Sequence, residues 1–223
     1  LGLPPIDSWA YTLRGDAYSA KLQFDRAIDD YNEALKLKPN YYAALVGRAD
    51  TFELQGDHAR ALEDYNAAIE ASPAWSVAYR ARGVSELNQN RFQEALDDLH
   101  HANVLQPSDP YAVLWMQLVR WKTGAGNGSL ATDAKYLDRK VWPWPVVALV
   151  QGSMTPDQVL ATAKKNDLPS RGHECEALFY VGEYFLAARD PHGKGYIQAA
   201  ADMCPSTYIE FVGARAELTR LGG

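Results

Sequence analysis

PNYYAALVGRADTFELQGDHARALEDYNAAIEAS, residues 39–72, is followed directly by PAWSVAYRARGVSELNQNRFQEALDDLHHANVLQ, residues 73–106, and then by Pro107. The prolines that open the two stretches and the one that follows them stand 34 residues apart, and the chain before Pro39 keeps the same pattern. The columns that coincide are Tyr11, Leu45 and Tyr79; Gly15, Ala49 and Gly83; Ala27, Ala61 and Ala95; Tyr31, Tyr65 and Leu99; and Ala34, Ala68 and Ala102. Self-similarity at a fixed period of this length indicates an array of small structural units.

The order of large and small columns, closed by a proline, resembles the tetratricopeptide repeat, a helix–turn–helix unit that stacks into a solenoid. The sequence therefore predicts an all-α fold: a solenoid of helical hairpins with a non-standard helical C-terminal tail and a capping helix. Repeats of this family nearly always bind other proteins and seldom carry out chemistry. The resemblance thus implies an interaction protein.

The pattern divides the chain into four parts. We expect an extended leader at 1–7, three regular repeats at 8–107, a degenerate fourth repeat with irregular helices at 108–172, and a fifth hairpin with the capping helix at 173–223. In the first repeat the helices should run from Ser8 to about Lys21 and from about Phe24 to Lys38, because Pro39 cannot continue a helix.

The elements after Pro107 are less regular. Asp109 and Pro110 should cap and open one helix, and Thr155 with Gln158 has the form of a capping box. The expected helices are Tyr111 to Lys122, about Leu130 to Lys140, a short one opened by Pro145, Thr155 to about Lys165, Glu174 to Ala188, Lys194 to Met203, and Thr207 to about Leu221. The segment from Thr123 to Ser129 is expected to be a turn and Asn166 to Gly172 a loop.

Composition excludes some classes of partner. The net charge is −6 and the pI about 5.4, so no basic field is available to bind nucleic acid. The longest apolar run near the Trp-rich segment, Val146 to Val150, is far short of the roughly 20 residues of a membrane span. The first residue is Leu, which we interpret as a trimmed or processed form whose upstream sequence is not seen.

An arginine column and an aspartate column change together. The arginines are Arg14, Arg48 and Arg82, and sixteen residues after each stand Asp30, Asp64 and Asp98. In the fourth repeat both columns are lost, to Met116 and Thr132. This predicts a ladder of inter-helix ion pairs that fixes the register. The pattern leaves open whether each arginine meets the aspartate of its own repeat or of a neighbour.

No catalytic or metal-binding motif is found. The glycines at 124, 126 and 128 lack the strand and the GK[ST] ending of a phosphate loop. His173 near Cys175 has no further ligand close in sequence, and the adjacent His100 and His101 point to different sides of a helix. We therefore predict a protein that is not an enzyme and that needs no cofactor and no metal.

In tetratricopeptide proteins, four positions of each first helix face the concave side of the solenoid. Here those positions mix acidic and apolar residues, which suits an extended peptide carrying a basic and an apolar side chain; the alternative is an ordinary solvated face. The partner-binding residues predicted in this way are Trp9, Thr12, Asp16, Val46, Asp50, Glu53, Val77, Arg80 and Val84. Chaperone C-terminal tails are disfavoured, because an acidic wall would repel a terminal carboxylate.

The C-terminal half has a second resemblance. The matching stretches are Leu114-Trp115, Trp142 and Trp144 before an apolar helix ending Gln151-Gly152, Phe179 to Leu186, and Tyr208-Ile209-Glu210 with Ala214, Glu217 and Leu218. They resemble the NlpI-type bacterial outer-membrane lipoproteins. This resemblance implies a periplasmic, dimeric adaptor that docks a tail-specific protease and peptidoglycan hydrolases.

Cys175 and Cys204 lie at equal distances from the turn of the last hairpin, so a disulfide between its helices is geometrically plausible. Such bridges persist in oxidising compartments, and the resemblance points to the periplasm independently. Two buried free thiols are the alternative.

Three hypotheses about function follow. The first is a non-catalytic adaptor or scaffold of the bacterial cell envelope, periplasmic and associated with the outer membrane, that brings a protease or hydrolase to its substrate. The second is a generic cytosolic or secretion-linked interaction module, which would keep its cysteines reduced. The third is the interaction domain of a larger enzyme. Dimerisation is expected from the resemblance, through exposed aromatic residues such as Trp9 or those near Tyr111.

Overall fold

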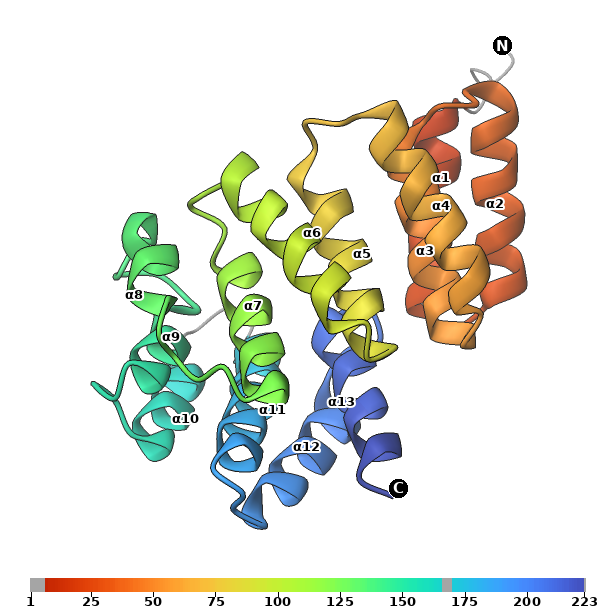
Figure 1. Ribbon diagram of the computed structural model, residues 1–223. Helices are drawn as coiled ribbons and strands as arrows, with labels where there is room; N and C mark the ends of the chain where they lie inside the picture. Colours follow the sequence, from red (N-terminus) through yellow and green to blue (C-terminus); the bar gives the residue numbers. More distant parts are fainter. Residues whose placement is uncertain (1–6, 166–169, 223) are drawn as a thin grey trace.

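A computed structural model describes residues 7–165 and 170–222. Within these ranges the chain is helical, without strands, and successive helices form hairpins (Figure 1). Three hairpins fall on the three regular repeats, as the sequence predicts. Their helices are α1 Ser8–Ala20 and α2 Phe24–Leu37, α3 Tyr42–Gln55 and α4 His58–Ala71, and α5 Ser76–Asn88 and α6 Phe92–Leu105. Of the predicted leader only Asp7 is described, and its side chain caps α1 by accepting from the Ala10 N–H at 2.8 Å.

The small and large columns are the two sides of one contact between paired helices. A Cβ atom on Gly83 of α5 would lie 2.9 Å from Leu99 Cγ and 3.1 Å from the Ala95 carbonyl oxygen of α6. Ala95 and Leu99 are fully buried. The two helices can therefore approach closely only because Gly83 on α5 has no side chain, and the side chain of Leu99 on α6 fills the space that Gly83 leaves. Gly56 ends α3 in the left-handed region at φ +79°, which makes the tight turn into α4.

The fourth repeat begins as expected. Asp109 accepts a hydrogen bond from the Tyr111 N–H at 2.9 Å and caps α7 Pro110–Thr123. The predicted helix from Leu130 to Lys140 is wrong in its length. The chain forms α8 Leu130–Asp133 and one 3-10 turn, η1 Ala134–Tyr136, and becomes extended at Leu137. The last buried apolar residue of this segment is Leu137, and the three residues that follow are charged. A helix continued through them would have no apolar side chain to pack against the core.

The remaining helices are α9 Trp144–Val150, α10 Pro156–Lys165, α11 Ser170–Ala187, α12 His192–Met203 and α13 Ile209–Arg220. The capping box is formed: the Thr155 N–H donates to Gln158 Oε1 at 2.9 Å, and the Gln158 N–H donates to Thr155 Oγ1 at 3.3 Å. The predicted loop from Asn166 to Gly172 is wrong at its end, because Ser170 already starts α11; residues 166–169 lie outside the described ranges.

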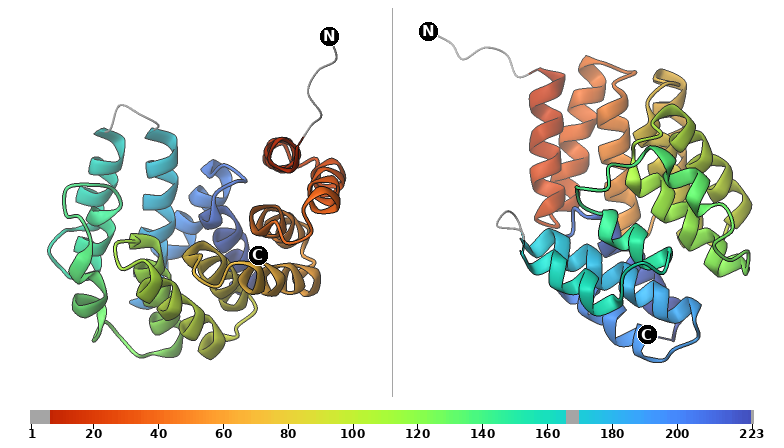
Figure 2. Two further views of the ribbon diagram at one scale, coloured as in Figure 1. Left: turned by 90° about the horizontal axis from the view of Figure 1, so that it is seen from above. Right: turned by 90° about the vertical axis from the view of Figure 1, so that its left-hand side faces the viewer.

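The hairpins follow an arc, and the C-terminal helices lie inside it (Figure 2, left view). As the expected cap, α13 packs against α12, but it also contacts α11 and α5. The Ser206 hydroxyl, just before α13, donates to the carbonyl of Ala20 at the end of α1, at 3.0 Å. The last element of the chain therefore returns to the first.

Cys175 on α11 and Cys204 at the end of α12 are joined by a disulfide, with Cα atoms 4.9 Å apart. The largest hydrophobic core surrounds this region and includes Trp115, Phe179 and Tyr180. Tyr111 points into it and donates to Glu176, so the expectation that aromatic residues near Tyr111 are exposed is wrong for Tyr111 itself. No described helix has the length and hydropathy that crossing a bilayer would require.

Candidate functional site

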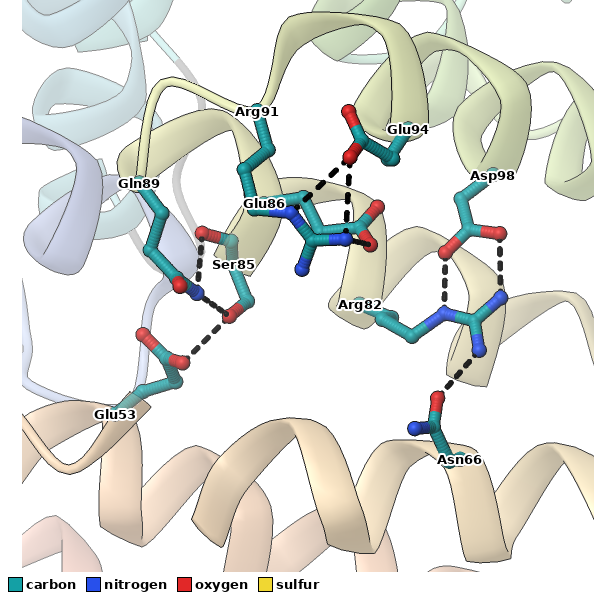
Figure 3. A network of polar contacts seen from close by, with 9 residues as sticks. All are labelled: Glu53, Asn66, Arg82, Ser85, Glu86, Gln89, Arg91, Glu94 and Asp98. Atoms are coloured by element: carbon teal, nitrogen blue, oxygen red, sulfur yellow. Dashed lines mark hydrogen bonds and ion pairs between the residues drawn. The ribbon is translucent and has the colours of Figure 1, made fainter. Parts of the chain in front are cut away.

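The arginine ladder joins the two helices of each repeat. Arg82 on α5 donates through Nε to Asp98 Oδ2 at 2.5 Å and through Nη2 to Asp98 Oδ1 at 2.7 Å (Figure 3). Arg14 with Asp30 and Arg48 with Asp64 make the same two-pronged contact. Each arginine therefore meets the aspartate of its own repeat, which settles the choice that the sequence left open.

The neighbouring repeat takes part in the ladder as well. Arg82 Nη1 donates to Asn66 Oδ1 and Arg48 Nη1 to Asn32 Oδ1, each at 2.6 Å, and each asparagine belongs to the preceding repeat. Arg14 has no described repeat before it, and its side chain is 49% exposed against 22% for Arg48. Asn32 and Asn66 were missed in the sequence, although their 34-residue spacing marks them as a column.

The concave side of the first three repeats holds a cavity of about 390 Å³. The first helices of the three repeats, α1, α3 and α5, form one wall of it. Seven of the nine predicted partner-binding residues line this cavity: Asp16, Val46, Asp50, Glu53, Val77, Arg80 and Val84. Its volume is in the range of ordinary ligand sites.

The other two predicted residues do not line the cavity. Trp9 is 59% exposed on α1, while Thr12 is buried and its hydroxyl donates to the Ser8 carbonyl within the same helix. The part of α1 that lines the cavity is its C-terminal half, at Asp16 and Ser19. We call the residues that line the cavity the groove.

Two buried tyrosines orient the groove carboxylates. The Tyr31 hydroxyl on α2 donates to Asp16 Oδ1 at 2.7 Å, and the Tyr65 hydroxyl on α4 donates to Asp50 Oδ1 at 2.6 Å. In the third repeat Leu99 replaces the tyrosine and Val84 replaces the aspartate, so two buried apolar side chains of the main core take the place of the hydrogen-bonded pair. This joint change was visible in the sequence but was not singled out there.

The walls of the groove perturb these carboxylates. Loss of solvent is the main cause that raises the pKa of Asp50 to about 6; the neighbouring Glu53 contributes to this rise and the Tyr65 hydrogen bond opposes it. The Asp50 side chain is nevertheless exposed to the open cavity, as is that of Asp16. Desolvation likewise raises the pKa of Asp16, and the Tyr31 hydrogen bond opposes this. A cation placed in the groove would favour the charged form of both groups.

Polar contacts link the repeats along the groove. Ser85 of α5 donates to Glu53 Oε1 of α3 at 2.5 Å, and Gln89 Nε2 donates to the Ser85 hydroxyl at 3.0 Å (Figure 3). Thr51 donates to Ser19 in the same way one repeat earlier, at 3.0 Å. These contacts fix the spacing of the three helices that carry the groove residues.

Among the residues that line the groove, the single cation is already paired. Arg80 Nε lies 3.0 Å from Asp109 Oδ2, and its guanidinium stands over the Tyr111 ring at 5.7 Å. Asp16, Asp50 and Glu53 face the same cavity. The charge of the lining is therefore negative.

Behind the groove, further polar contacts join α11 to α7 and to α13. Glu176 on α11 accepts from the Tyr111 hydroxyl at 3.0 Å and from Trp142 Nε1 at 2.5 Å, and Glu210 on α13 accepts from the Tyr180 hydroxyl at 3.0 Å. Burial, together with the nearby Glu176, raises the pKa of Glu210 to about 7. Sequence reasoning used Trp142, Tyr180 and Glu210 only for the resemblance of the C-terminal half and did not predict the network, because no periodic column contains these residues.

Among the described residues, no three His, Cys, Asp or Glu side chains come together in a way that would hold a metal ion.

Residues 12–74 match the family model described as Tetratricopeptide repeat. The chain folds as a tetratricopeptide-repeat solenoid. Hairpins of α-helices in the described ranges and the interlocking small and large columns are those of this repeat.

Solved structures support the same fold. YrrB, described as a TPR protein with an unusual peptide-binding site, is 14% identical, with a TM-score of 0.52 over 95% of this chain and 94% of its own. A tetratricopeptide repeat protein from Parabacteroides merdae is 16% identical, with a TM-score of 0.55 over 90% and 80%. The first TPR of Spaghetti (RPAP3), bound to an HSP90 peptide, is 21% identical, with a TM-score of 0.50 over 53% and 94%.

Proposed function

We propose that this solenoid is a non-catalytic adaptor that binds an extended segment of a partner protein in its groove. The observation that carries the proposal is the cavity of about 390 Å³ on the concave side, lined by oriented carboxylates and aliphatic side chains. Peptide binding named for YrrB and for the first TPR of Spaghetti supports the same use of the fold.

The charge of the groove selects the chemistry of the partner. A segment with Lys or Arg beside an aliphatic residue complements Asp16 and Asp50 on one hand and Val46, Val77 and Val84 on the other. The HSP90 peptide of the Spaghetti complex, SRMEEVD, is acidic. Such a tail would meet like charge here, since Arg80 is held by Asp109.

Fluorescence anisotropy with labelled, end-capped peptides tests this. A peptide of Lys and Val should bind, and its counterpart with Glu in place of Lys should not. Asp50→Asn should weaken binding of the Lys peptide by roughly tenfold, the loss of one charge-assisted contact. Binding should strengthen as pH rises through about 6, where Asp50 ionises, and this dependence should fade in Asp50→Asn.

The matched control is Glu33→Gln, which removes a carboxylate from the exposed Lys36–Glu33 pair on α2. It should leave the affinity unchanged. Preferred binding of the acidic peptide, or equal effects of the two substitutions, would contradict the proposal.

We further propose that the adaptor works in the bacterial cell envelope, in the periplasm, where it links a protease or peptidoglycan hydrolases to their substrates. The resemblance of the C-terminal half to NlpI-type lipoproteins supports this, as does the Cys175–Cys204 disulfide, a bond that persists in oxidising compartments. A photo-crosslinker at Val46 should capture wall hydrolases or a tail-specific protease. Capture of cytosolic chaperones, with reduced cysteines in acid-trapped cells, would favour a cytosolic module instead.

The adaptor is also proposed to form a homodimer. The exposed face of α1 supports this, because Trp9 and Leu13 are 59% and 46% exposed and lie one helical turn apart. Light scattering should give twice the monomer mass. Trp9→Ser should lower that mass to the monomer value, and a monomer already in the unsubstituted protein would refute the dimer without affecting the groove.

A further inference from the structure

The groove has two walls made from distant parts of the chain. One wall consists of α1, α3 and α5, and the other consists of Ser206, Thr207, Tyr208, Ile209 and Val212. Figure 1 shows α13 beside α5, where this second wall begins. A segment bound in the groove would therefore lie between the repeats and the C-terminal segment Ser206–Val212, which we call the second wall.

The second wall is held in place by contacts that do not involve the groove. The disulfide ties Cys204, two residues before the wall, to α11. Glu210 accepts a hydrogen bond from the buried Tyr180 of α11, and a Cβ atom on Gly213 would lie within 2.9 Å of the Trp115 ring. These anchors lie on the C-terminal half of the molecule, so the wall is formed before any ligand arrives.

Two aliphatic side chains of the wall differ in their surroundings. Ile209 packs against the main core, and Val212 is half-buried but is not part of that packing. Val212 faces the cavity that Val46 and Val84 line from the opposite wall. The side chain of Val212 is thus available for contact with a ligand.

Extended backbone fits such a slot in a specific way. In an extended chain, successive side chains point to opposite sides. If one residue directs its side chain to Asp50 on the repeat wall, the next directs its own to Ile209 and Val212. The walls differ in charge. The repeat wall carries the carboxylates Asp16, Asp50 and Glu53 beside the paired Arg80, while the residues of the second wall that line the cavity, Ile209 and Val212 among them, include no charged side chain.

We propose that the second wall makes the groove specific for partner segments in which basic and aliphatic residues alternate, with the aliphatic side chains seated on Ile209 and Val212. This inference rests on the proposed function and adds the order of residues in the partner. The occupant is a segment of another protein, chosen by charge complementarity with the repeat wall.

Two peptides of equal composition test the order of residues: one alternates Lys and Val, and the other carries the same residues in two blocks. The alternating peptide should bind at least about tenfold more tightly, a difference of about 1.4 kcal/mol. Val212→Lys should weaken the binding of the alternating peptide by a similar factor. Thr219→Lys places the same charge on an exposed position of α13 outside the groove and should change the affinity less than about twofold.

A milder variant guards against misfolding. Val212→Ala should lower the affinity several-fold, and replacing the aliphatic residues of the peptide by Ala should then cost less than it does with the unsubstituted protein. Such coupling shows direct contact. Circular dichroism and thermal unfolding of each variant should match the unsubstituted protein.

The outcomes separate the two proposals. If Asp50→Asn weakens binding and the Val212 variants do not, or if the block peptide binds equally well, the second wall is refuted and the adaptor function stands. If no basic peptide binds, the proposed function itself fails. If Val212→Lys changes the oligomeric state of the protein but leaves the peptide affinity unchanged, the second wall is an interface between copies of the chain. That result would overturn the inference.

Discussion

At the scale of single residues, the ladder arginines do more than balance charge. A guanidinium presents Nε and one amino group in a planar fork that matches a carboxylate, and its other amino group remains available to a further acceptor. In Arg48 and Arg82 the fork takes the aspartate of the same repeat and the free group takes the asparagine of the preceding one. One side chain therefore joins three helices and sets both the hairpin and the stacking register.

Removing this contact should cost stability. Arg48→Ala leaves Asp64, whose side chain is 9% exposed, without its partner, so we expect the free energy of unfolding to fall by about 1–3 kcal/mol. Urea denaturation followed by circular dichroism measures this, with the m value unchanged. Lys36→Ala is the control. It removes the ion pair between Lys36 and Glu33, whose side chains are 69% and 45% exposed, and it should lower the free energy of unfolding by less than about 0.5 kcal/mol. Equal losses would contradict the structural role of the ladder.

At the scale of elements, α13 is placed by a buried carboxylate. Glu210 faces Tyr180 and Glu176 of α11, Tyr111 of α7 and, more distantly, Arg80 of α5. Burial also raises the pKa of Glu176. Two carboxyl groups that resist ionisation therefore lie where α13 meets the body of the protein, and ionising them costs free energy in the folded state.

The sign of the resulting pH dependence follows from the shift. The pKa of Glu210 is about 7 when folded, above its ordinary value of 4.5, so its contribution is fully present below about pH 4.5 and is lost as pH rises through 7. Stability measured by urea denaturation should fall between pH 5 and pH 8. Glu210→Gln keeps an acceptor for Tyr180 and should recover about 1–3 kcal/mol at pH 8 with little change at pH 5. Parallel curves for the two proteins would refute this assignment, and Glu33→Gln should give such a parallel curve.

At the scale of the whole molecule, the arc is held closed by contacts across long sequence distances. The Ser206–Ala20 hydrogen bond spans 186 residues. Lys122 on α7 adds contacts of 3.1 Å to Glu183 on α11 and 2.7 Å to Glu217 on α13. In an open tetratricopeptide solenoid each repeat contacts only the repeats next to it, whereas here the last helix faces the first three repeats.

Reduction of the disulfide should loosen the last hairpin, α11 and α12. Cys175→Ser with Cys204→Ser should lower the free energy of unfolding by roughly 3–4 kcal/mol, because the bridge restricts a 29-residue loop in the unfolded chain. The untreated protein should be lighter than the reduced one by two hydrogen atoms, and two thiols should react with an alkylating reagent only after reduction. Two reactive thiols in the untreated protein would refute the bridge. The double substitution should also weaken peptide binding if the second wall depends on this anchor.

The sequence by itself determined the repeats. Each hairpin is built from contacts within about 34 residues, so its columns of small and large side chains, its arginine ladder and most of its groove residues follow a period that can be read along the chain. The same reasoning placed Cys175 opposite Cys204, because equal distances from one turn are again a local relation.

Only the tertiary structure decided the second wall, the inward turn of Tyr111 and the buried pair of Glu176 and Glu210. These depend on the path of the irregular segment after Pro107, where the period is lost and short helices are chosen by what they can pack against. The curvature that brings Ser206 to Ala20 sums small rotations over all the repeats. No single stretch of sequence encodes that sum, which is why the repeat wall of the groove can be read from the sequence and the second wall appears only in the folded chain.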